Sequence, residues 1–154
     1  MKNLDNKKTA LFIILAVFLL LVDRFLKILA IGGIFDQPIW ILKNWFSLHF
    51  SPNPFIAFSL PVSGVILEVV IGLIILSLLY CFVVLLKQRK LSVSVFLFFT
   101  IVGAMSNFFD RLRYGFVIDY FDLKYFTVFN LADLMIVGGV LLLFFNQKTF
   151  LSKK

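Results

Sequence analysis

Residues 103–133 read GAMSNFFDRLRYGFVIDYFDLKYFTVFNLAD, and this stretch joins two long apolar segments of the chain. Its polar side chains include Asn107, Asp110, Arg111, Asp119, Asn130 and Asp133. A charged side chain at bilayer depth costs at least about 2.5–3.5 kcal/mol, so membrane segments tend to keep such groups where they have a function. The stretch therefore predicts a functional site, and two of its carboxylates could form a catalytic pair.

The composition predicts a polytopic membrane protein. The chain has 154 residues, of which 62% are hydrophobic, and it contains 21 Phe. These values lie outside the usual range for soluble domains, and the length suits one membrane-embedded domain over residues 1–154. The formal net charge is +7, but the basic residues are split among three short segments. This distribution argues against a nucleic-acid partner, which would favour one basic face.

Four apolar segments are long enough to cross about 30 Å of hydrocarbon at about 1.5 Å per residue. They are residues 9–31, 60–86, 91–109 and 129–146. We expect an all-α integral membrane fold with four transmembrane helices. Basic clusters at both ends and at residues 87–90 place both termini in the cytoplasm. Gly138 and Gly139 are expected to allow close approach of a neighbouring helix.

The two outer connections contain sequence that is typical of strands. Residues 38–42 (PIWIL), 45–50 (WFSLHF) and 116–121 (FVIDYF) are rich in aromatic and branched side chains, with partial alternation. They predict a small extracytoplasmic β element, with Trp40 and Trp45 at the level of the lipid headgroups.

Helical rise places polar residues of three segments near the outer boundary of the bilayer, where water reaches them. These residues are Asp23, Lys27, Asn107, Asp110, Asn130 and Asp133. Asp23 and Lys27 are four residues apart and share one helical face. Convergence at one depth predicts a single site and argues against functional groups spread across the membrane.

Two carboxyl groups that share a proton can direct water at a peptide bond. The ionised group takes a proton from water, and the protonated group hydrogen-bonds to the carbonyl oxygen. Asp119 and Asp133 are the candidates, because the fourteen residues between them could turn back and neither has an obvious basic neighbour in sequence. Taken alone, Asp119 is equally well explained as a solvated loop carboxylate. Asp133 alone is also explained as a charge favoured at a helix N-terminus.

The remaining charged groups have structural alternatives. Asp110 is adjacent to Arg111 and close to Arg113, so a structural ion pair at the helix end is favoured over catalysis. Asp23 and Lys27 form either a stabilising bridge beneath the site or a contact with substrate, and both interpretations stay open.

Other catalytic designs have less support. His49 is the single histidine and no H-E-x-x-H is present, which argues against a zinc site. Cys81 lies in an apolar run and is expected to be an inert thiol. Ser59 or Ser106 could serve a serine–lysine hydrolase, but nothing in the sequence positions a lysine. Glu68 is either a groove contact or a snorkelling residue.

Five blocks of the chain resemble motifs of the bacterial lipoprotein signal peptidases (signal peptidase II), and the three blocks within residues 103–133 agree with the family in order and spacing. Residues 103–111 (GAMSNFFDR) resemble G-A-x-G-N-x-x-D-R, and 117–119 (VID) resemble V-V-D. Residues 129–133 (FNLAD) resemble F-N-x-A-D. Near the start, residues 23–27 (DRFLK) resemble D-Q-x-x-K, and 53–59 (NPFIAFS) resemble N-x-G-A-A-F-S.

The resemblance implies a membrane aspartic endopeptidase with Asp119 and Asp133 as its catalytic pair. It implies a diacylglyceryl-modified prolipoprotein substrate, cut before the lipidated cysteine, and neither a cofactor nor a metal. We expect the enzyme to be a monomer among membrane lipids of the bacterial cytoplasmic membrane, with its site facing outward. Further residues expected to bind substrate or support the pair are Asp23, Lys27, Asn53, Asn107, Asp110, Arg111 and Asn130.

The chain departs from the family pattern at positions that include 24, 55, 56 and 106. Ser106 replaces a glycine, Arg24 replaces a glutamine, and Phe55 with Ile56 replaces a small Gly-Ala pair. The bulk of Phe55 is expected to change how the first outer connection lies over the substrate groove. Two rival functions remain: a non-catalytic binder of lipoprotein precursors, and a small transporter that uses intramembrane charges.

Overall fold

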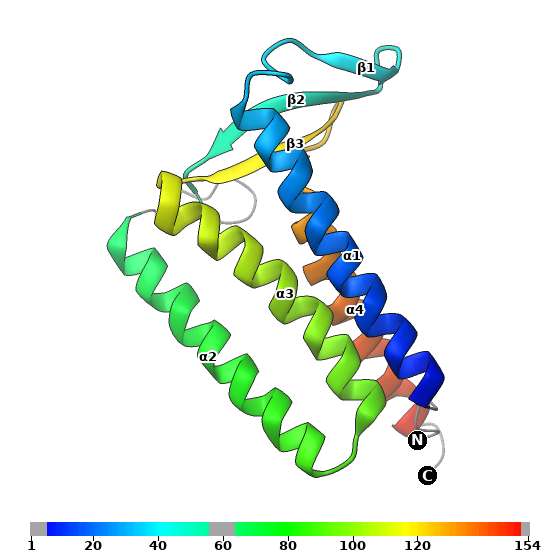
Figure 1. Ribbon diagram of the computed structural model, residues 1–154. Coiled ribbons are helices and arrows are strands. Elements are labelled where there is room, and N and C mark those ends of the chain that lie inside the picture. Colours follow the sequence, from blue (N-terminus) through cyan, green and yellow to red (C-terminus); the bar gives the residue numbers. More distant parts are fainter. Residues whose placement is uncertain (1–5, 56–63, 152–154) are drawn as a thin grey trace.

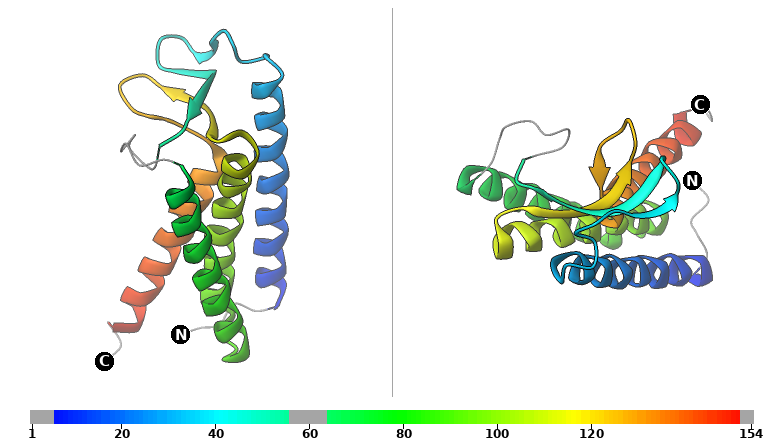
Figure 2. Two further views of the ribbon diagram at one scale, coloured as in Figure 1. Left: turned by 90° about the vertical axis from the view of Figure 1, so that its left-hand side faces the viewer. Right: turned by 90° about the horizontal axis from the view of Figure 1, so that it is seen from above.

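The helices of the protein form a bundle with a small sheet across one end (Figures 1 and 2). The computed structural model describes residues 6–55 and 64–151, with the side chains of 147–151 excepted. Its elements are α1 (Asn6–Ile31), β1 (Ile39–Leu42), β2 (Phe46–Asn53), α2 (Val65–Lys87), α3 (Leu91–Tyr114), β3 (Val117–Leu123), β4 (Val128–Phe129) and α4 (Leu131–Leu151).

Three of the helices, α1, α2 and α3, are long and apolar enough to cross a membrane. The apolar part of α4 with described side chains, Leu131–Asn146, is shorter than these three. The predicted spans 9–31, 60–86 and 91–109 therefore correspond to α1, α2 and α3, although residues 60–63 lie outside the described residues. The fourth span at 129–146 and the cytoplasmic position of both termini stay predictions.

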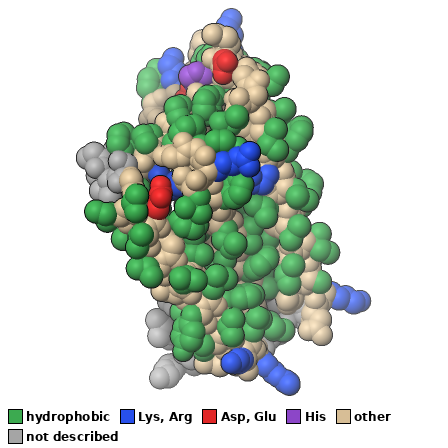
Figure 3. All heavy atoms as spheres, turned by 60° about the vertical axis from the view of Figure 1, so that its left-hand side comes forward, with side chains coloured by type: hydrophobic (Ala, Val, Ile, Leu, Met, Phe, Trp, Pro, Cys, Tyr) green, Lys and Arg blue, Asp and Glu red, His purple; other side chains and the backbone are tan. Residues whose placement is uncertain are grey.

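The surface of the bundle has the apolar character that lipid contact requires. Large hydrophobic side chains such as Leu11, Ile14 and Ile66 are exposed on α1 and α2. Figure 3 shows hydrophobic side chains over much of one face, with Lys and Arg side chains at its lower end and also in its upper half. Since exposed apolar surface of this extent is unfavourable in water, the helices are suited to a bilayer.

The central helix, α3, is longer than its apolar sequence predicts. The expected span ends at Phe109, but α3 continues through Asp110 and Arg111 to Tyr114. The prediction was short because it stopped where hydrophobicity stopped, whereas both charged side chains are satisfied by contacts with other segments. Gly115 ends the helix with φ of 78°, the left-handed conformation that favours glycine at this position.

Glycines allow α3 and α4 to pack closely. Close approach was predicted at both Gly138 and Gly139, and it is found at Gly139 only. A Cβ atom on Gly139 would lie 2.8 Å from the carbonyl oxygen of Phe96, whereas one on Gly138 would meet no atom within 4 Å. Gly103 on α3 contributes a second close approach, because a Cβ there would lie 2.5 Å from the carbonyl oxygen of Ala132. The α3–α4 contact thus reaches the residues next to Asp133.

Gly139→Ala is expected to lower the free energy of unfolding by about 1–3 kcal/mol, because the added methyl group would press on the backbone of α3. Gly138→Ala is the matched control, and its effect is expected to be neutral or stabilising by up to about 1 kcal/mol. Thermal unfolding of both purified variants in the same detergent measures the difference. Equal midpoints for the two variants would contradict this helix interface.

The connections between α1 and α2 and between α3 and α4 form an antiparallel sheet, whose four described strands have the order β1-β2-β3-β4. The three sequences predicted as strands correspond to β1, β2 and β3, except that their first residues, Pro38, Trp45 and Phe116, lie just outside the strands. The two-residue β4 was not predicted. Asp119 in β3 pairs with Ser51 in β2. Buried Ile118 and Tyr120 of β3 pack with Ala30 at the end of α1. The sheet is therefore fixed to the bundle through the strand that carries Asp119.

Candidate active site

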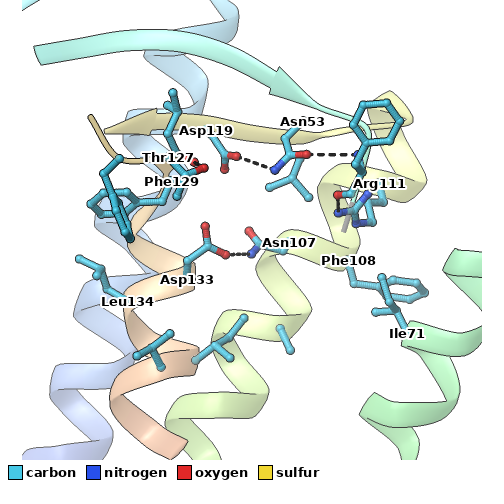
Figure 4. A pocket seen from close by; sticks show the side chains of 17 residues that line it. Asn53, Ile71, Asn107, Phe108, Arg111, Asp119, Thr127, Phe129, Asp133 and Leu134 are labelled. Atoms are coloured by element: carbon cyan, nitrogen blue, oxygen red, sulfur yellow. Dashed lines mark hydrogen bonds between the residues drawn. The ribbon is translucent and has the colours of Figure 1, made fainter. Parts of the chain in front are cut away.

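Asp119 and Asp133 lie on adjoining elements and line the same cavity. Asp119 is the third residue of β3, and Asp133 is the third residue of α4. Figure 4 shows both carboxyl groups pointing into the space between these elements. The cavity has a volume of about 590 Å³. The chain returns through β4, which pairs with β3 and leads directly into α4.

The wall of this cavity is largely apolar. Its hydrophobic residues come from the helices, the strands and the connection after β2, and include Phe55, Ile71, Phe108, Phe126, Phe129 and Leu134. Its polar residues are Asn53, Asn107, Arg111, Asp119, Thr127 and Asp133. An apolar cavity with a few converging polar groups is typical of sites for ligands with a large hydrophobic part.

Each of the four carboxyl oxygens accepts a hydrogen bond from another described residue. Asn130 Nδ2 donates to Asp119 Oδ1 at 2.6 Å, and Asn53 Nδ2 donates to Asp119 Oδ2 at 3.0 Å. Asn107 Nδ2 donates to Asp133 Oδ1 at 2.7 Å, and the backbone amide of Asn130 donates to Asp133 Oδ2 at 3.2 Å. The three predicted asparagines thus hold the two carboxyl groups in defined orientations.

Asn130 also begins α4. Its Oδ1 accepts a hydrogen bond from the backbone amide of Asp133 at 2.9 Å, while Asp133 Oδ2 accepts one from the amide of Asn130. This reciprocal pattern is a capping box, formed here by an Asn and an Asp. The sequence left two alternatives for Asp133, a charge at a helix N-terminus or a member of a carboxylate pair. In the structure Asp133 lies at the helix N-terminus and also lines the cavity.

Burial and the charge of Asp133 raise the pKa of Asp119 from its ordinary value of 3.8 to about 7. Desolvation is the larger cause, because Asp119 is 2% exposed and its charged form is disfavoured there. Hydrogen bonds from Asn53 and Asn130 and the charge of Lys27 lower the pKa in part. Asp119 is consequently expected to hold a proton at neutral pH or slightly below.

A buried charge cluster lies between α1 and α3, close to the cavity. Asp110 Oδ1 pairs with Arg24 Nη1 at 2.5 Å, and Asp110 Oδ2 pairs with Lys27 Nζ at 2.8 Å. The prediction that Asp110 pairs with Arg111 or Arg113 is therefore wrong in its partners, although the ion pair itself exists. The partners come from α1 because the polar segments of α1 and α3 pack at the same level.

The cluster joins Asp23 and Lys27 in a bridge of 3.1 Å, and both side chains are fully buried. Neither residue lines the cavity. Lys27 Nζ also donates to Asn107 Oδ1 at 2.8 Å, and Asn107 in turn contacts Asp133. These contacts favour the role of a stabilising bridge, connected to the carboxylate pair through one asparagine.

Arg111 lines the cavity and holds the chain that follows β2. Its guanidinium donates to the carbonyl oxygens of Pro54 at 3.3 Å and Phe55 at 2.6 Å. Phe55 also donates its backbone amide to Asn53 Oδ1 at 3.1 Å, and its side chain lines the cavity. This is consistent with the expected effect of Phe55 on the groove, while Ile56 lies outside the described residues.

Three contact residues were not identified as part of the site from sequence. Tyr120 and Ser106 each donate a hydroxyl hydrogen bond to Asp23, at 2.9 Å and 2.6 Å. Arg24 contacts Ser106 Oγ at 3.3 Å as well as Asp110. One indication of this contact was present in the sequence, because Arg24 and Ser106 are both departures from the family pattern and they contact one another. Tyr120 gave no signal beyond its place next to Asp119.

The serine–lysine alternative is also changed by the structure. Lys27 Nζ lies 3.4 Å from Ser106 Oγ, so the structure places beside this serine a lysine that the sequence did not identify. However, Ser106 is 3% exposed, donates its hydroxyl to Asp23 and is not a cavity residue. A substrate cannot reach this hydroxyl in the structure. Ser59 lies outside the described residues.

The other residues considered from sequence do not line the cavity. His49 is half-buried in β2, Cys81 is exposed on α2, and Glu68 is half-buried on α2 without lining the cavity. Within residues 6–55 and 64–151, no group of three His, Cys, Asp or Glu side chains is arranged to hold a metal ion.

Comparison with known families and sequences gives one consistent result. The profile of the family described as Signal peptidase (SPase) II matches residues 15–148. A lipoprotein signal peptidase of Caldicellulosiruptor bescii is 38% identical over 149 residues, covering 92% of this chain and 96% of the relative. A lipoprotein signal peptidase of Chlorobaculum parvum is 34% identical, covering 90% of this chain and 96% of the relative.

Solved structures share the fold. One, described as a bacterial membrane enzyme at 2.3 Å resolution, has a TM-score of 0.80 at 23% identity and covers 99% of this chain and 94% of its own. A second such structure, at 1.9 Å resolution, has a TM-score of 0.72 at 23% identity and covers 95% of this chain and 96% of its own. The arrangement of helices and sheet is therefore one that membrane enzymes adopt.

Proposed function

Because this chain belongs to the signal peptidase II family, and is therefore a membrane-embedded peptidase of lipoprotein processing, we propose that it is an aspartic endopeptidase with Asp119 and Asp133 as its catalytic pair. Its proposed substrate is a diacylglyceryl-modified prolipoprotein, cut just before the lipidated cysteine. The observation that carries the proposal is the pair of carboxyl groups facing one apolar cavity from β3 and α4.

In the proposed mechanism, water attacks the scissile carbonyl carbon between the two carboxyl groups. Asp133 takes the proton from water, because it lies at the N-terminus of α4, where the helix dipole favours negative charge. Asp119 carries the shared proton, in keeping with its raised pKa, and hydrogen-bonds to the carbonyl oxygen. The proton that Asp133 took from water then passes to the leaving amine nitrogen as the carbon–nitrogen bond breaks.

The lining of the cavity suits a lipid-modified peptide at the surface of a membrane. Phe108, Ile71 and Leu134 extend apolar surface from the carboxylate pair along the helices. The basic residues Lys87, Arg89 and Lys90 lie at the end of α2 and in its connection to α3, at the end of the bundle opposite the sheet (Figure 1). By the positive-inside rule, the sheet and the cavity are then on the extracytoplasmic side.

Cleavage of a matched pair of peptides tests this function. The purified protein in detergent is incubated with a precursor peptide whose cysteine carries a diacylglyceryl group, and with the same peptide unmodified. We expect the free signal fragment, ending just before the cysteine, from the lipidated peptide only. Binding of the lipidated peptide without cleavage would contradict the peptidase and support a precursor binder. Absence of both binding and cleavage would contradict these two functions and favour the small transporter.

The rate of cleavage is expected to fall as the pH rises through about 7. The pKa of Asp119 is raised to that value, so the proton needed on the pair is present below it and lost above it. The charged groups that act on Asp119 are Asp133, which raises the pKa, and Lys27, which lowers it. Measurement of kcat/KM from about pH 5 to pH 9 checks this, and a rate that rises through neutrality would count against it.

A further inference from the structure

The hydroxyl group of Tyr120 connects the two elements that carry the carboxylate pair. On the premise of the proposed function, we propose that Tyr120 is a positioning residue that sets the separation of Asp119 and Asp133. Tyr120 follows Asp119 in β3, and its hydroxyl contacts the start of the helix that carries Asp133.

Three elements meet at this hydroxyl. It donates to Asp23 Oδ1 of α1 at 2.9 Å and accepts a hydrogen bond from the backbone amide of Leu131 in α4 at 3.0 Å. The residue is fully buried. One hydroxyl thus links α1, β3 and α4 at a point where water cannot replace it.

The contact is part of a complete set of partners for the first amides of α4. The first amide groups of a helix have no partner within the helix and need one elsewhere. Here the amide of Leu131 donates to Tyr120, that of Ala132 donates to Asp23 Oδ1 at 3.2 Å, and that of Asp133 donates to Asn130. The first two partners belong to β3 and α1, so they fix where the helix begins relative to these two elements.

The hydroxyl, and not the ring alone, makes this connection. The ring of Tyr120 packs against that of Phe121, with ring centroids 4.7 Å apart. It belongs to the apolar cluster between the sheet and the end of α1 that contains Ala30, Phe35 and Ile118. Burial and the charge of Asp23 raise the pKa of the phenol far above its usual value, so it remains a donor at any working pH. Phenylalanine would keep the packing and remove only the link.

Tyr120→Phe is expected to lower kcat by about 10–100-fold and to change KM by less than about twofold, because a displacement of about 1 Å between reacting groups can cost about 100-fold. The alkaline limb of the pH profile should move to lower pH, since a more distant Asp133 raises the pKa of Asp119 less. Tyr80→Phe on the exposed face of α2 is the control, and wild-type kinetics are expected for it.

A second variant separates positioning from stability. Proline has no backbone N–H and is well suited to the first position of a helix, so Leu131→Pro removes the amide that Tyr120→Phe leaves without a partner. In the double variant we expect the unfolding midpoint to recover towards that of Leu131→Pro alone, while kcat stays low and the alkaline limb stays displaced. Recovery of kcat together with the midpoint would overturn the positioning role.

The outcomes distinguish this inference from the proposed function. Wild-type cleavage of the lipidated peptide, lost in Asp119→Asn, supports the function before Tyr120 is tested. If Tyr120→Phe then has wild-type kcat and an unmoved pH profile, only the positioning role fails. If the wild-type protein does not cleave the peptide, the proposed function fails, and the positioning role fails with it.

Discussion

Asp119→Asn and Asp133→Asn are each expected to reduce cleavage of the lipidated precursor by about 10²–10⁴-fold, the range that general acid–base groups contribute. Asparagine has nearly the shape of aspartate but neither takes a proton from water nor donates one to a peptide carbonyl. Because the two groups act as one unit, the double variant should be little worse than either single variant. Initial rates with purified proteins measure these losses.

The fold is expected to survive both changes. Asp119 is buried and its pKa is raised by that burial, so its neutral replacement removes an unfavourable charge at pH 8. The thermal midpoint of Asp119→Asn should therefore equal or exceed that of the wild type. Asp122→Asn is the matched control, since Asp122 lies three residues further along β3 and does not line the cavity. Substantial cleavage by either Asp119→Asn or Asp133→Asn would remove the basis of the proposed mechanism.

Lys27→Met is expected to destabilise the protein by about 3–5 kcal/mol, the cost of removing one partner from a buried ion pair. Lys27 pairs with Asp23 and with Asp110, and all three side chains are fully buried. With Lys27 absent, Asp110 keeps Arg24, but Asp23 has no cationic partner among the described ion pairs. The change should also disturb Asn107, which accepts a hydrogen bond from Lys27.

Unfolding of Lys27→Met in detergent, followed by circular dichroism during heating, measures this cost. Lys124→Met is the control, because Lys124 lies beyond β3 in an exposed turn. Adding Asp23→Asn to Lys27→Met removes the unpaired charge and should restore part of the lost stability. A midpoint for Lys27→Met within experimental error of the wild type would show that the cluster contributes nothing to folding.

The helices and strands followed closely from local sequence. Apolar length located α1, α2 and α3, and aromatic, branched segments located β1 to β3. The errors arose where a contact with another segment decided the outcome. Helix α3 continues past Phe109 because Asp110 and Arg111 find partners outside it, and no property of residues 110–114 alone shows this.

The same distinction applies to the site. Helical rise placed Asn107, Asn130 and Asp133 near one boundary of the bilayer. Asp119 was inferred from its residue type and its position in an outer connection, and Asn53 came only from the family resemblance. The partner of Asp110 could not be read from sequence, because Arg111 and Arg113 are nearer along the chain while Arg24 is nearer in space. Gly138 and Gly139 were indistinguishable, because which glycine faces α3 depends on the rotation of α4 about its axis.

One proton held between Asp119 and Asp133 is the central physical claim of the proposed mechanism. Infrared difference spectra of the purified protein, recorded across pH 7, detect a protonated carboxyl group through its carbonyl absorption. We predict that the wild type loses this absorption as the pH rises through about 7 and that Asp119→Asn shows no loss at that midpoint. Identical spectra for the two proteins, or a wild type with no protonated carboxyl group below pH 7, would contradict the shared proton.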